Sequence, residues 1–75
     1  MTVTTWGIIG PGAIAHNFAD GLAESRSGKL VAIAGRDAAR RGAFGDRYGI
    51  DIAQRHADAA ALLADPGIRA IYIAT

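Results

Sequence analysis

The chain has 75 residues, of which 51% are hydrophobic and 20% charged, a composition that suits one globular domain or part of one and excludes disorder. A formal net charge of +1 gives no basis for binding nucleic acid or a membrane surface. Because it has no cysteine, no signal-peptide pattern and no apolar stretch long enough to span a membrane, the sequence predicts a cytoplasmic protein without disulfides or thiolate metal sites.

A strand and a glycine-rich turn open the chain. The run from about Val3 to Ile9 predicts a strand, and the Gly-Pro-Gly-Ala-Ile-Ala segment after it has the G-x-G-x-x-G/A form of a dinucleotide-binding turn. In such a turn Gly10 permits a tight bend, Gly12 lets the backbone approach a pyrophosphate, and Ala15 permits close packing of helix on strand. The helix that begins here would direct free N–H groups and its positive dipole end at the phosphates.

The helix after the turn carries one apolar stripe that should face a sheet. Its members recur at helical spacing: Ile14, Ala15, Phe18, Ala19 and Leu22. Ser27-Gly28 is expected to end this helix, and the next strand, Leu30–Ala34, is apolar throughout, as in strands covered on both faces. Strand, turn, helix and strand form a βαβ unit of about 30 residues, the context in which the glycine pattern is informative.

A second helix is predicted over Ala38–Tyr48. Asp37 is its candidate cap, Gly42 and Gly45 weaken it, and Gly49 ends it. The aromatic residues expected to pack in the core are Trp6, Phe44, Tyr48 and Tyr72.

Three shorter elements complete the pattern. We expect a third strand around Ile52–Gln54, a helix over Ala59–Ala64 capped by Asp58, and a buried fourth strand over Ala70–Thr75. The alternation predicts an α/β fold, a doubly wound parallel sheet of the Rossmann type with four strands in the order 3-2-1-4. Because an apolar strand would be left at the edge, we expect the chain to be the front portion of a longer protein.

Three segments carry a resemblance to a known family: Trp6–Ala15, Leu30–Asp37 and Leu62–Thr75. In this order they resemble the N-terminal domain of the Gfo/Idh/MocA oxidoreductases, which include glucose–fructose oxidoreductase, inositol dehydrogenases and dihydrodiol dehydrogenase. The resemblance implies an NAD(P)-binding Rossmann domain over residues 1–75, incomplete at its C-terminus and without the substrate domain. The full-length parent would be an NAD(P)-dependent dehydrogenase.

The resemblance also implies where the cofactor binds. The pyrophosphate would contact the opening turn, and the nicotinamide side would lie near the end of the fourth strand. The residues implied for these two roles are Gly10, Pro11, Gly12, Ala13, Ile14, Ala74 and Thr75. The family's catalytic Lys, in a Glu-Lys-Pro motif, and its downstream Asp and His would lie beyond the chain, so we expect residues 1–75 to have no catalytic residue and no dehydrogenase activity alone. We expect the full-length protein to act on a sugar, polyol or related carbonyl compound and to be a homo-oligomer.

The end of the second predicted strand bears on the choice between NAD and NADP. An NAD site usually places Asp or Glu about 20 residues after the turn, where it binds the ribose hydroxyls. Here Gly35 is followed by Arg36, with Arg40 one turn into the next helix, and a small residue plus Arg fits a 2′-phosphate. We therefore expect NADP. NAD remains possible if Asp37 binds the ribose and Arg36 points to solvent.

The remaining polar residues have simpler interpretations. His16 is near the turn, but it shares a stripe with Asp20 and Glu24, which favours a solvated helix face. His56 has no second ligand at metal spacing, so no metal site is predicted. Arg41 is expected to be solvated.

The leading hypothesis is therefore the cofactor-binding segment of an NAD(P)-dependent oxidoreductase. The alternative is a non-catalytic nucleotide-sensing module with the same fold. A Glu-Lys-Pro stretch and a substrate domain beyond Thr75 would favour the enzyme, and their absence from the parent gene would favour the sensor. A third hypothesis, that the fold binds another ligand such as S-adenosylmethionine, has less support, because Arg36 suits a 2′-phosphate that this methyl donor lacks.

Overall fold

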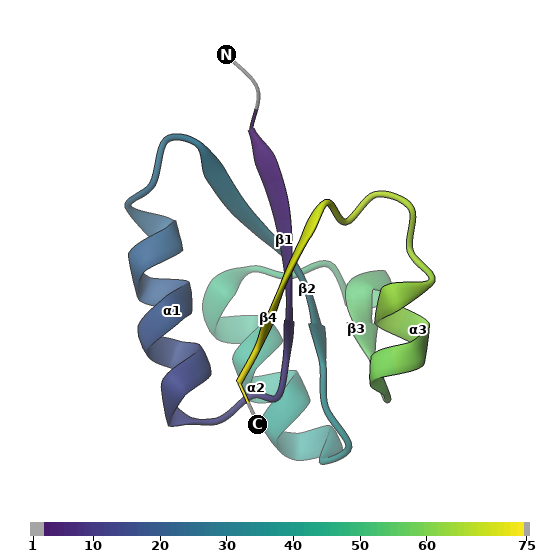
Figure 1. The fold of residues 1–75 in the computed structure, drawn as a ribbon. Helices are drawn as coiled ribbons and strands as arrows, with labels where there is room; N and C mark the ends of the chain where they lie inside the picture. Colours follow the sequence, from purple (N-terminus) through teal and green to yellow (C-terminus); the bar gives the residue numbers. More distant parts are fainter. Residues whose placement is uncertain (1–2, 75) are drawn as a thin grey trace.

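A four-stranded parallel sheet forms the centre of the computed structural model, which describes residues 3–74 (Figure 1). The strands are β1 (Thr4–Ile9), β2 (Gly28–Ala34), β3 (Arg55–His56) and β4 (Ala70–Ile73). The helices are α1 (Ala13–Ala23), α2 (Ala38–Tyr48), the short 3-10 helix η1 (Ile52–Gln54) and α3 (Ala59–Leu63). The strand order β3-β2-β1-β4, with every pair parallel, confirms the predicted doubly wound α/β sheet.

The helices cover both faces of the sheet, as the apolar β2 predicts. The cluster against α1 and α2 contains Ile8, Ala15, Ala19, Ile33, Phe44 and Ile50. The cluster on the other face, against α3, contains Ala32, Ala34 and Leu62. Successive residues of β2 thus enter opposite clusters, and Figure 1 shows α1 and α3 on opposite sides of the strands.

Small and aromatic residues fit β1 to its neighbours. At Gly7 an added Cβ would lie 3.0 Å from Leu62 Cδ2, so glycine lets α3 approach the strand closely. Trp6 packs edge-on against Phe18 with ring centroids 5.1 Å apart, and Phe18 stacks on Tyr72 at 4.1 Å. These contacts join β1, α1 and β4, as predicted for Trp6 and Tyr72.

The third strand lies later than the sequence predicts. Residues 52–54 form the 3-10 turn η1, and β3 begins only at Arg55. The Asp51 carboxylate accepts a hydrogen bond of 3.1 Å from the Ala53 N–H, which stabilises a turn there. Ile52 is 80% exposed, so no burial of its side chain favours a strand.

Two other boundaries also differ from the prediction. Helix α1 ends at Ala23 rather than at Ser27-Gly28, and β2 already begins at Gly28. Between them the Ser25 hydroxyl accepts hydrogen bonds from the N–H groups of Ser27 and Gly28, so a side chain holds the connection. β4 is half-buried rather than buried, and Ile73 is 67% exposed.

Candidate functional site

The turn between β1 and α1 has the predicted tight bend. Gly10 has φ +98°, a conformation that favours glycine, and its N–H donates to the Ala34 carbonyl at 2.8 Å. Gly12 caps α1 with extended backbone, and no side chain accepts a hydrogen bond from the first turn of this helix. An added Cβ at Gly12 would meet no protein atom within 4 Å. The start of α1 therefore has no side-chain cap, and no protein atom covers Gly12 on the side where a Cβ would lie.

The other helices in residues 3–74 begin differently, because an aspartate caps each of them. Asp37 Oδ1 accepts hydrogen bonds from the N–H groups of Ala39 and Arg40, at 2.9 and 3.1 Å. Asp51 and Asp58 do the same for η1 and α3. In the part of the chain that the structure describes, only α1 leaves its positive end without a carboxylate.

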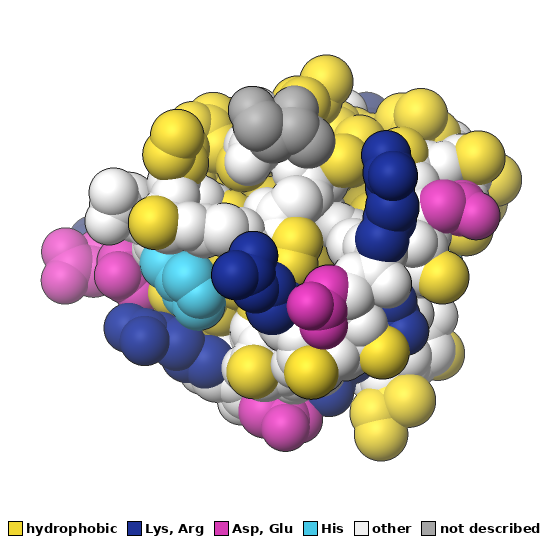
Figure 2. All heavy atoms as spheres, turned by 90° about the horizontal axis from the view of Figure 1, so that it is seen from below, with side chains coloured by type: hydrophobic (Ala, Val, Ile, Leu, Met, Phe, Trp, Pro, Cys, Tyr) yellow, Lys and Arg dark blue, Asp and Glu magenta, His cyan; other side chains and the backbone are white. Residues whose placement is uncertain are grey.

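Two clefts lie on either side of Pro11. The first, of about 660 Å³, is called the β2–α3 cleft, and its lining includes Gly10, Pro11, Gly35, Arg36 and residues 57–60. The second, of about 480 Å³, is called the α1–α2 cleft, and its lining includes Pro11, Gly12, Ala13, His16, Arg40, Phe44 and Arg47. Figure 2 views the carboxyl edge of the sheet and shows basic side chains (dark blue) and a histidine (cyan) on this face, with acidic side chains (magenta) among them.

The arginines after β2 have three different environments. Arg36 is exposed and lines the β2–α3 cleft, whereas Arg40 is exposed and lines the α1–α2 cleft. Arg41 is half-buried and donates from Nη1 to the Gly35 carbonyl at 2.6 Å, so the prediction that it is solvated is wrong. This contact ties the start of α2 to the end of β2.

Gly35 also fixes the distance between β2 and the glycine turn. An added Cβ at this position would lie 2.8 Å from Pro11 Cδ and 3.1 Å from Pro11 Cγ. The Gly35 N–H donates to the His56 carbonyl at 3.0 Å, which extends the pairing of β2 with β3. Glycine is thus required here by close packing of two loops.

The side chain of His16, a residue of α1, packs against α2, so the solvated position predicted for it is wrong. Its ring is half-buried, with its centroid 4.8 Å from that of Phe44. Nδ1 lies 3.0 Å from the hydroxyl of Tyr48, which also lies 2.9 Å from Asp20 Oδ1. Burial, followed by the hydrogen bond to Asp20, raises the pKa of Tyr48 above its ordinary value.

The end of β4 lies beside the glycine turn. The Ala74 N–H donates to the Ile9 carbonyl at 2.9 Å, so the two predicted contact regions for the cofactor are brought to one edge. Ile14 is 57% exposed, contrary to the predicted sheet-facing stripe, because the buried face of α1 is centred on Ala15 and Ala19. Thr75 lies outside the described residues.

The described residues hold no group of three or more His, Cys, Asp or Glu side chains placed to bind a metal. His56 is half-buried in β3, with Nε2 3.3 Å from Gln54 Oε1. Within residues 3–74, no helix has the length and apolar character needed to cross a membrane.

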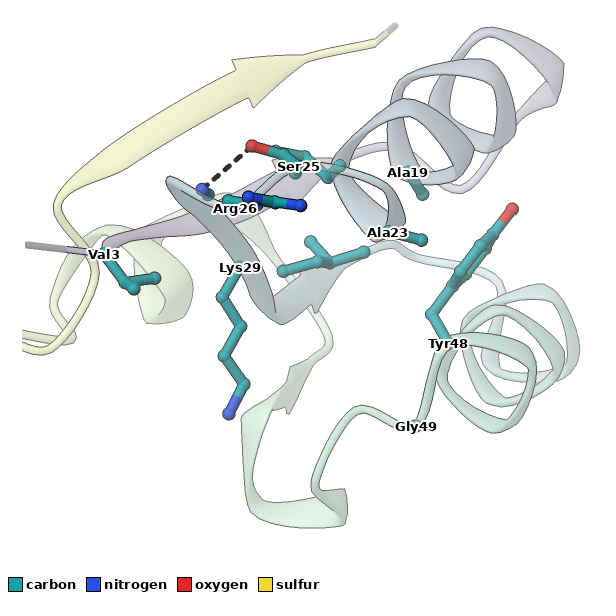
Figure 3. A pocket seen from close by; sticks show the side chains of 11 residues that line it. Val3, Ala19, Ala23, Ser25, Arg26, Lys29, Tyr48 and Gly49 are labelled. Carbon is teal, nitrogen blue, oxygen red and sulfur yellow. Dashed lines mark hydrogen bonds between the residues drawn. The ribbon is translucent and has the colours of Figure 1, made fainter. Parts of the chain in front are cut away.

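A third cleft, of about 420 Å³, lies at the amino end of β2 (Figure 3). Val3, Arg26, Lys29 and Tyr48 are among its lining residues, and none of the predicted site residues is. It opens where β1 and β2 begin, whereas the glycine turn lies where they end.

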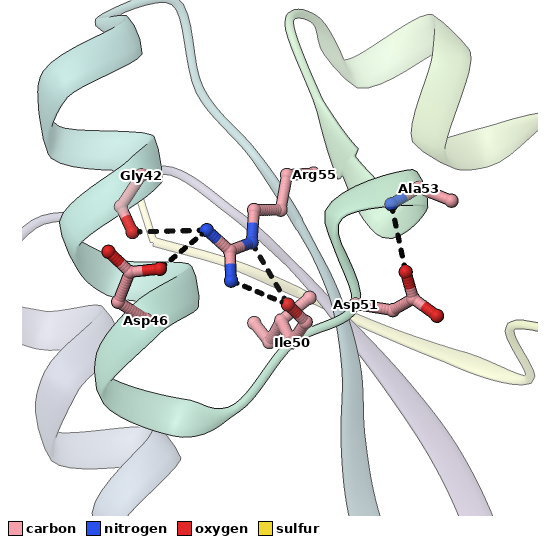
Figure 4. Close-up of polar contacts among 6 residues, drawn as sticks. All are labelled: Gly42, Asp46, Ile50, Asp51, Ala53 and Arg55. Atoms are coloured by element: carbon pink, nitrogen blue, oxygen red, sulfur yellow. Dashed lines mark hydrogen bonds and ion pairs between the residues drawn. The ribbon is translucent and has the colours of Figure 1, made fainter.

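Sequence reasoning missed Arg55, which holds α2 against β3 (Figure 4). Its guanidinium donates to the Ile50 carbonyl at 2.7 and 2.9 Å, to the Gly42 carbonyl at 3.4 Å and to Asp46 Oδ1 at 2.8 Å. An added Cβ at Gly45 would overlap this guanidinium. The sequence signal that could have indicated this contact is Gly45 inside a predicted helix, because a glycine at such a position often permits the close approach of another group.

Residues 4–75 match the family model for the Gfo/Idh/MocA oxidoreductases, described as an oxidoreductase family with an NAD-binding Rossmann fold. The chain belongs to this family. It is an NAD(P)-binding Rossmann domain of the Gfo/Idh/MocA type, and the predicted fold and family are both confirmed. The comparison with curated proteins gives no match.

Several solved structures of oxidoreductases are similar to the chain. One from Agrobacterium radiobacter, in complex with NAD+, L-tartaric acid and magnesium, is 36% identical with a TM-score of 0.91, over 99% of this chain and 21% of that one. An oxidoreductase from Desulfitobacterium hafniense, described as putative and NADPH-dependent, is 30% identical with a TM-score of 0.86, over 100% of this chain and 21% of that one. myo-Inositol dehydrogenase from Lactobacillus casei, with NAD(H) and myo-inositol, is 25% identical with a TM-score of 0.90, over 99% of this chain and 22% of that one. The chain therefore spans about a fifth of the length of these proteins.

Proposed function

We propose that residues 1–75 form the cofactor-binding part of an oxidoreductase that transfers a hydride between NADP(H) and a sugar, polyol or related carbonyl compound. The observation that carries the proposal is the open N-terminus of α1, where Gly12 has no capping side chain and faces open space. Family membership supports the oxidoreductase class. When bound, the nicotinamide supplies or accepts the hydride.

The pyrophosphate would bind at the β1–α1 turn. The N–H groups of the first turn of α1 would donate to its oxygens, and the dipole of this 11-residue helix would stabilise the negative charge. The absence of a Cβ at Gly12 leaves room for the phosphate to approach the backbone. The residues proposed for this role are Gly10, Pro11, Gly12, Ala13 and Ile14.

The adenosine would lie along the end of β2. The β2–α3 cleft is lined by alanines, including Ala34, Ala57 and Ala60, which suit a flat apolar base. Gly35 and Pro11 separate this cleft from the α1–α2 cleft, and they would flank the ribose.

The arginines beyond Gly35 support a preference for NADP over NAD. Arg36 and Arg40 are exposed at this edge, and a guanidinium binds a phosphate through charge-assisted hydrogen bonds. Asp37 is the residue that would favour NAD, but its Oδ1 already accepts two N–H groups of α2. We therefore propose that Asp37 serves mainly as the cap.

The nicotinamide would lie beside Ile14 and the end of β4, near Ala74 and Thr75. Ile14 is exposed there, which would suit contact with a flat ring. Neither Ile14 nor Ala74 can hold or move a proton, so we propose that the acid or base for hydride transfer comes from other parts of the protein. The complexes of relatives with L-tartaric acid and with myo-inositol support a polyhydroxylated substrate.

The substitution Gly12→Val tests the proposed function. In the intact protein it should weaken binding of both NADPH and NADH by about 100-fold or more, because its Cβ branch occupies the phosphate position. Fluorescence titration measures the affinities, and circular dichroism checks the fold. Gly21→Val is the matched control, because Gly21 lies in the same helix, is exposed and has no protein atom within 4 Å of its added Cβ.

Unchanged affinity in the Gly12→Val variant would contradict the proposal. Normal cofactor binding by the wild type without turnover of any sugar or polyol would instead favour the nucleotide-sensing alternative.

Arg36→Ala tests the proposed cofactor preference. One charge-assisted hydrogen bond contributes about 1.5–3 kcal/mol, so NADPH affinity should fall by about 10- to 150-fold while NADH affinity barely changes. Arg26→Ala is the control, since Arg26 is an exposed arginine at the opposite edge of the sheet. An equal loss for both cofactors would mean that Arg36 has a structural role.

A further inference from the structure

The β2–α3 cleft is lined by two short segments and by the glycine turn. One wall is the end of β2 and the connection after it, residues 34–36, and the other is residues 57–60, which lead from β3 into α3. Gly10 and Pro11 line the cleft between these walls. Residues 57–60 are three alanines and Asp58, so Asp58 carries the one polar side chain of its wall.

The two carboxylate oxygens of Asp58 have different surroundings. Oδ1 accepts a hydrogen bond of 2.8 Å from the Ala61 N–H and thereby caps α3. Among residues 3–74, no group donates a hydrogen bond to Oδ2, and no basic side chain forms an ion pair with the carboxylate. Because the capping bond restrains the side chain, Asp58 offers the cleft a hydrogen-bond acceptor in a restricted position.

We propose that Asp58 is a specificity-determining residue that selects adenine over purines with a carbonyl oxygen at position 6. The inference rests on the proposed function, which gives this cleft to the adenine, and it adds which edge of the base is recognised. With the ribose beside Gly35 and Pro11, the base enters the cleft from N9. The 6-amino group lies across the purine from N9 and would point to the wall formed by residues 57–60.

The hydrogen-bonding groups of Asp58 and adenine are complementary. A carboxylate only accepts hydrogen bonds, and the 6-amino group of adenine donates them. Hypoxanthine and guanine carry a carbonyl oxygen at this position, so two acceptors would face each other without a proton between them. The proton on N1 of these bases is one ring atom away, and it reaches Oδ2 only if the base shifts in the cleft.

Arg36 is the other charged residue of the lining, and it would give the opposite selectivity. Its guanidinium has donors only, so beside position 6 it would favour a carbonyl oxygen over an amino group. Arg36 belongs to the β2 wall, next to the position proposed for the ribose. The base preference of the protein therefore distinguishes recognition by Asp58 from recognition by Arg36.

The test measures this preference in the intact protein. Fluorescence titration compares NADPH with its hypoxanthine analogue and NADH with its own analogue, so the result does not depend on the 2′-phosphate. The wild type should bind the adenine form about 3- to 10-fold more tightly in both pairs. In Asp58→Asn the amide oxygen can still cap α3, which places the N–H₂ group where Oδ2 was. The ratio of the two affinities should then fall to about one or below.

The ratio also removes the effect of charge, because the two ligands of a pair have the same phosphates. Asp51→Asn is the matched control, since Asp51 caps η1 in the same way and lines none of the three clefts. It should keep the wild-type ratio. Asp58→Ser is a second variant that keeps a capping oxygen without an amide, and its ratio should also fall. Circular dichroism checks the fold of each variant.

Equal affinity of the wild type for the adenine and hypoxanthine forms would overturn the inference. An unchanged ratio in a folded Asp58→Asn variant would also overturn it. A wild type that prefers the hypoxanthine form would overturn it and assign the base to Arg36. A wild type that binds none of the four dinucleotides contradicts the proposed function instead.

Discussion

The N-termini of α1 and α2 lie next to each other at the carboxyl edge of the sheet, yet they are built in opposite ways. At α2, Asp37 accepts two backbone N–H groups and places a carboxylate on the positive end of the helix. At α1, Gly12 offers no side chain, so the same kind of N–H groups has no side-chain acceptor. The sequence thus satisfies one helix end with its own carboxylate and leaves the other without a side-chain cap, where we propose that the pyrophosphate binds.

The connections before the two helices also differ, because the one before α1 is open and the one before α2 is filled by packed groups. The β1–α1 turn needs positive φ at Gly10 and an unobstructed surface at Gly12. The β2–α2 connection is filled instead, because Gly35 packs on Pro11 and its carbonyl accepts from Arg41. The uncapped start of α1 lowers the stability of the free protein, whereas the capped start of α2 raises it. Such a difference is expected where a ligand completes the fold.

The largest effect on stability is expected at the contact between the two turns. Gly35→Val would place its Cβ about 2.8 Å from the rigid ring of Pro11, so one of the two loops must move. Overpacking of this kind costs about 1–3 kcal/mol in the free energy of unfolding, and displacing Pro11 should weaken both cofactors. Urea unfolding of the intact protein measures the loss, and wild-type stability would show that the turns are less tightly coupled.

Gly45→Ala should destabilise α2 by a similar amount. Although alanine favours a helix, the Cβ would displace the Arg55 guanidinium from its partners Ile50 and Asp46. Gly42→Ala is the matched control in the same helix, where the added Cβ meets no atom within 4 Å. The control should stabilise by about 0.5–1 kcal/mol. Stabilisation by both substitutions in thermal unfolding would contradict the role given to Arg55.

Asp37→Ala should separate capping from cofactor binding. Loss of the cap costs about 0.5–2 kcal/mol of stability, while NADPH affinity should remain within about twofold of wild type. A selective loss of NADH binding in a titration would show instead that Asp37 binds the ribose hydroxyls.

The smallest effect is a dependence of stability on pH. Because the pKa of Tyr48 is raised in the folded chain, the unfolded chain loses its phenolic proton first as pH increases. The stabilisation is fully present below the unfolded pKa and is lost as pH rises through the folded pKa. Tyr48→Phe should therefore flatten the decline in stability above about pH 10, measured by urea unfolding across this range. An unchanged slope would assign that decline to other groups.

Features encoded by neighbouring residues could be predicted from the sequence. The bend at Gly10, the cap at Asp37 and the left-handed end of α2 at Gly49 each depend on only a few adjacent residues. Features set by contacts across the chain could not. His16 meets Tyr48 over 32 residues, and Arg55 meets the carbonyl of Gly42 over 13, so their sequence neighbours carry no sign of the partner. The polar stripe predicted for α1 is present in the sequence, but the side chain of His16 packs against α2 and does not face solvent.

We propose that the open N-terminus of α1 is the pyrophosphate site, and the substitution Gly12→Asp is the strongest test of this assignment. Gly12 already has the extended backbone of a capping residue, so aspartate can cap α1 as Asp37 caps α2. Titration with NADPH and NADH measures the cofactor affinities, and thermal unfolding of the intact protein measures the stability. We predict equal or higher stability without cofactor and a loss of affinity of about 100-fold or more for both cofactors, because the carboxylate takes the place of the phosphate. Full cofactor affinity in a stable Gly12→Asp variant would contradict a pyrophosphate site at the N-terminus of α1.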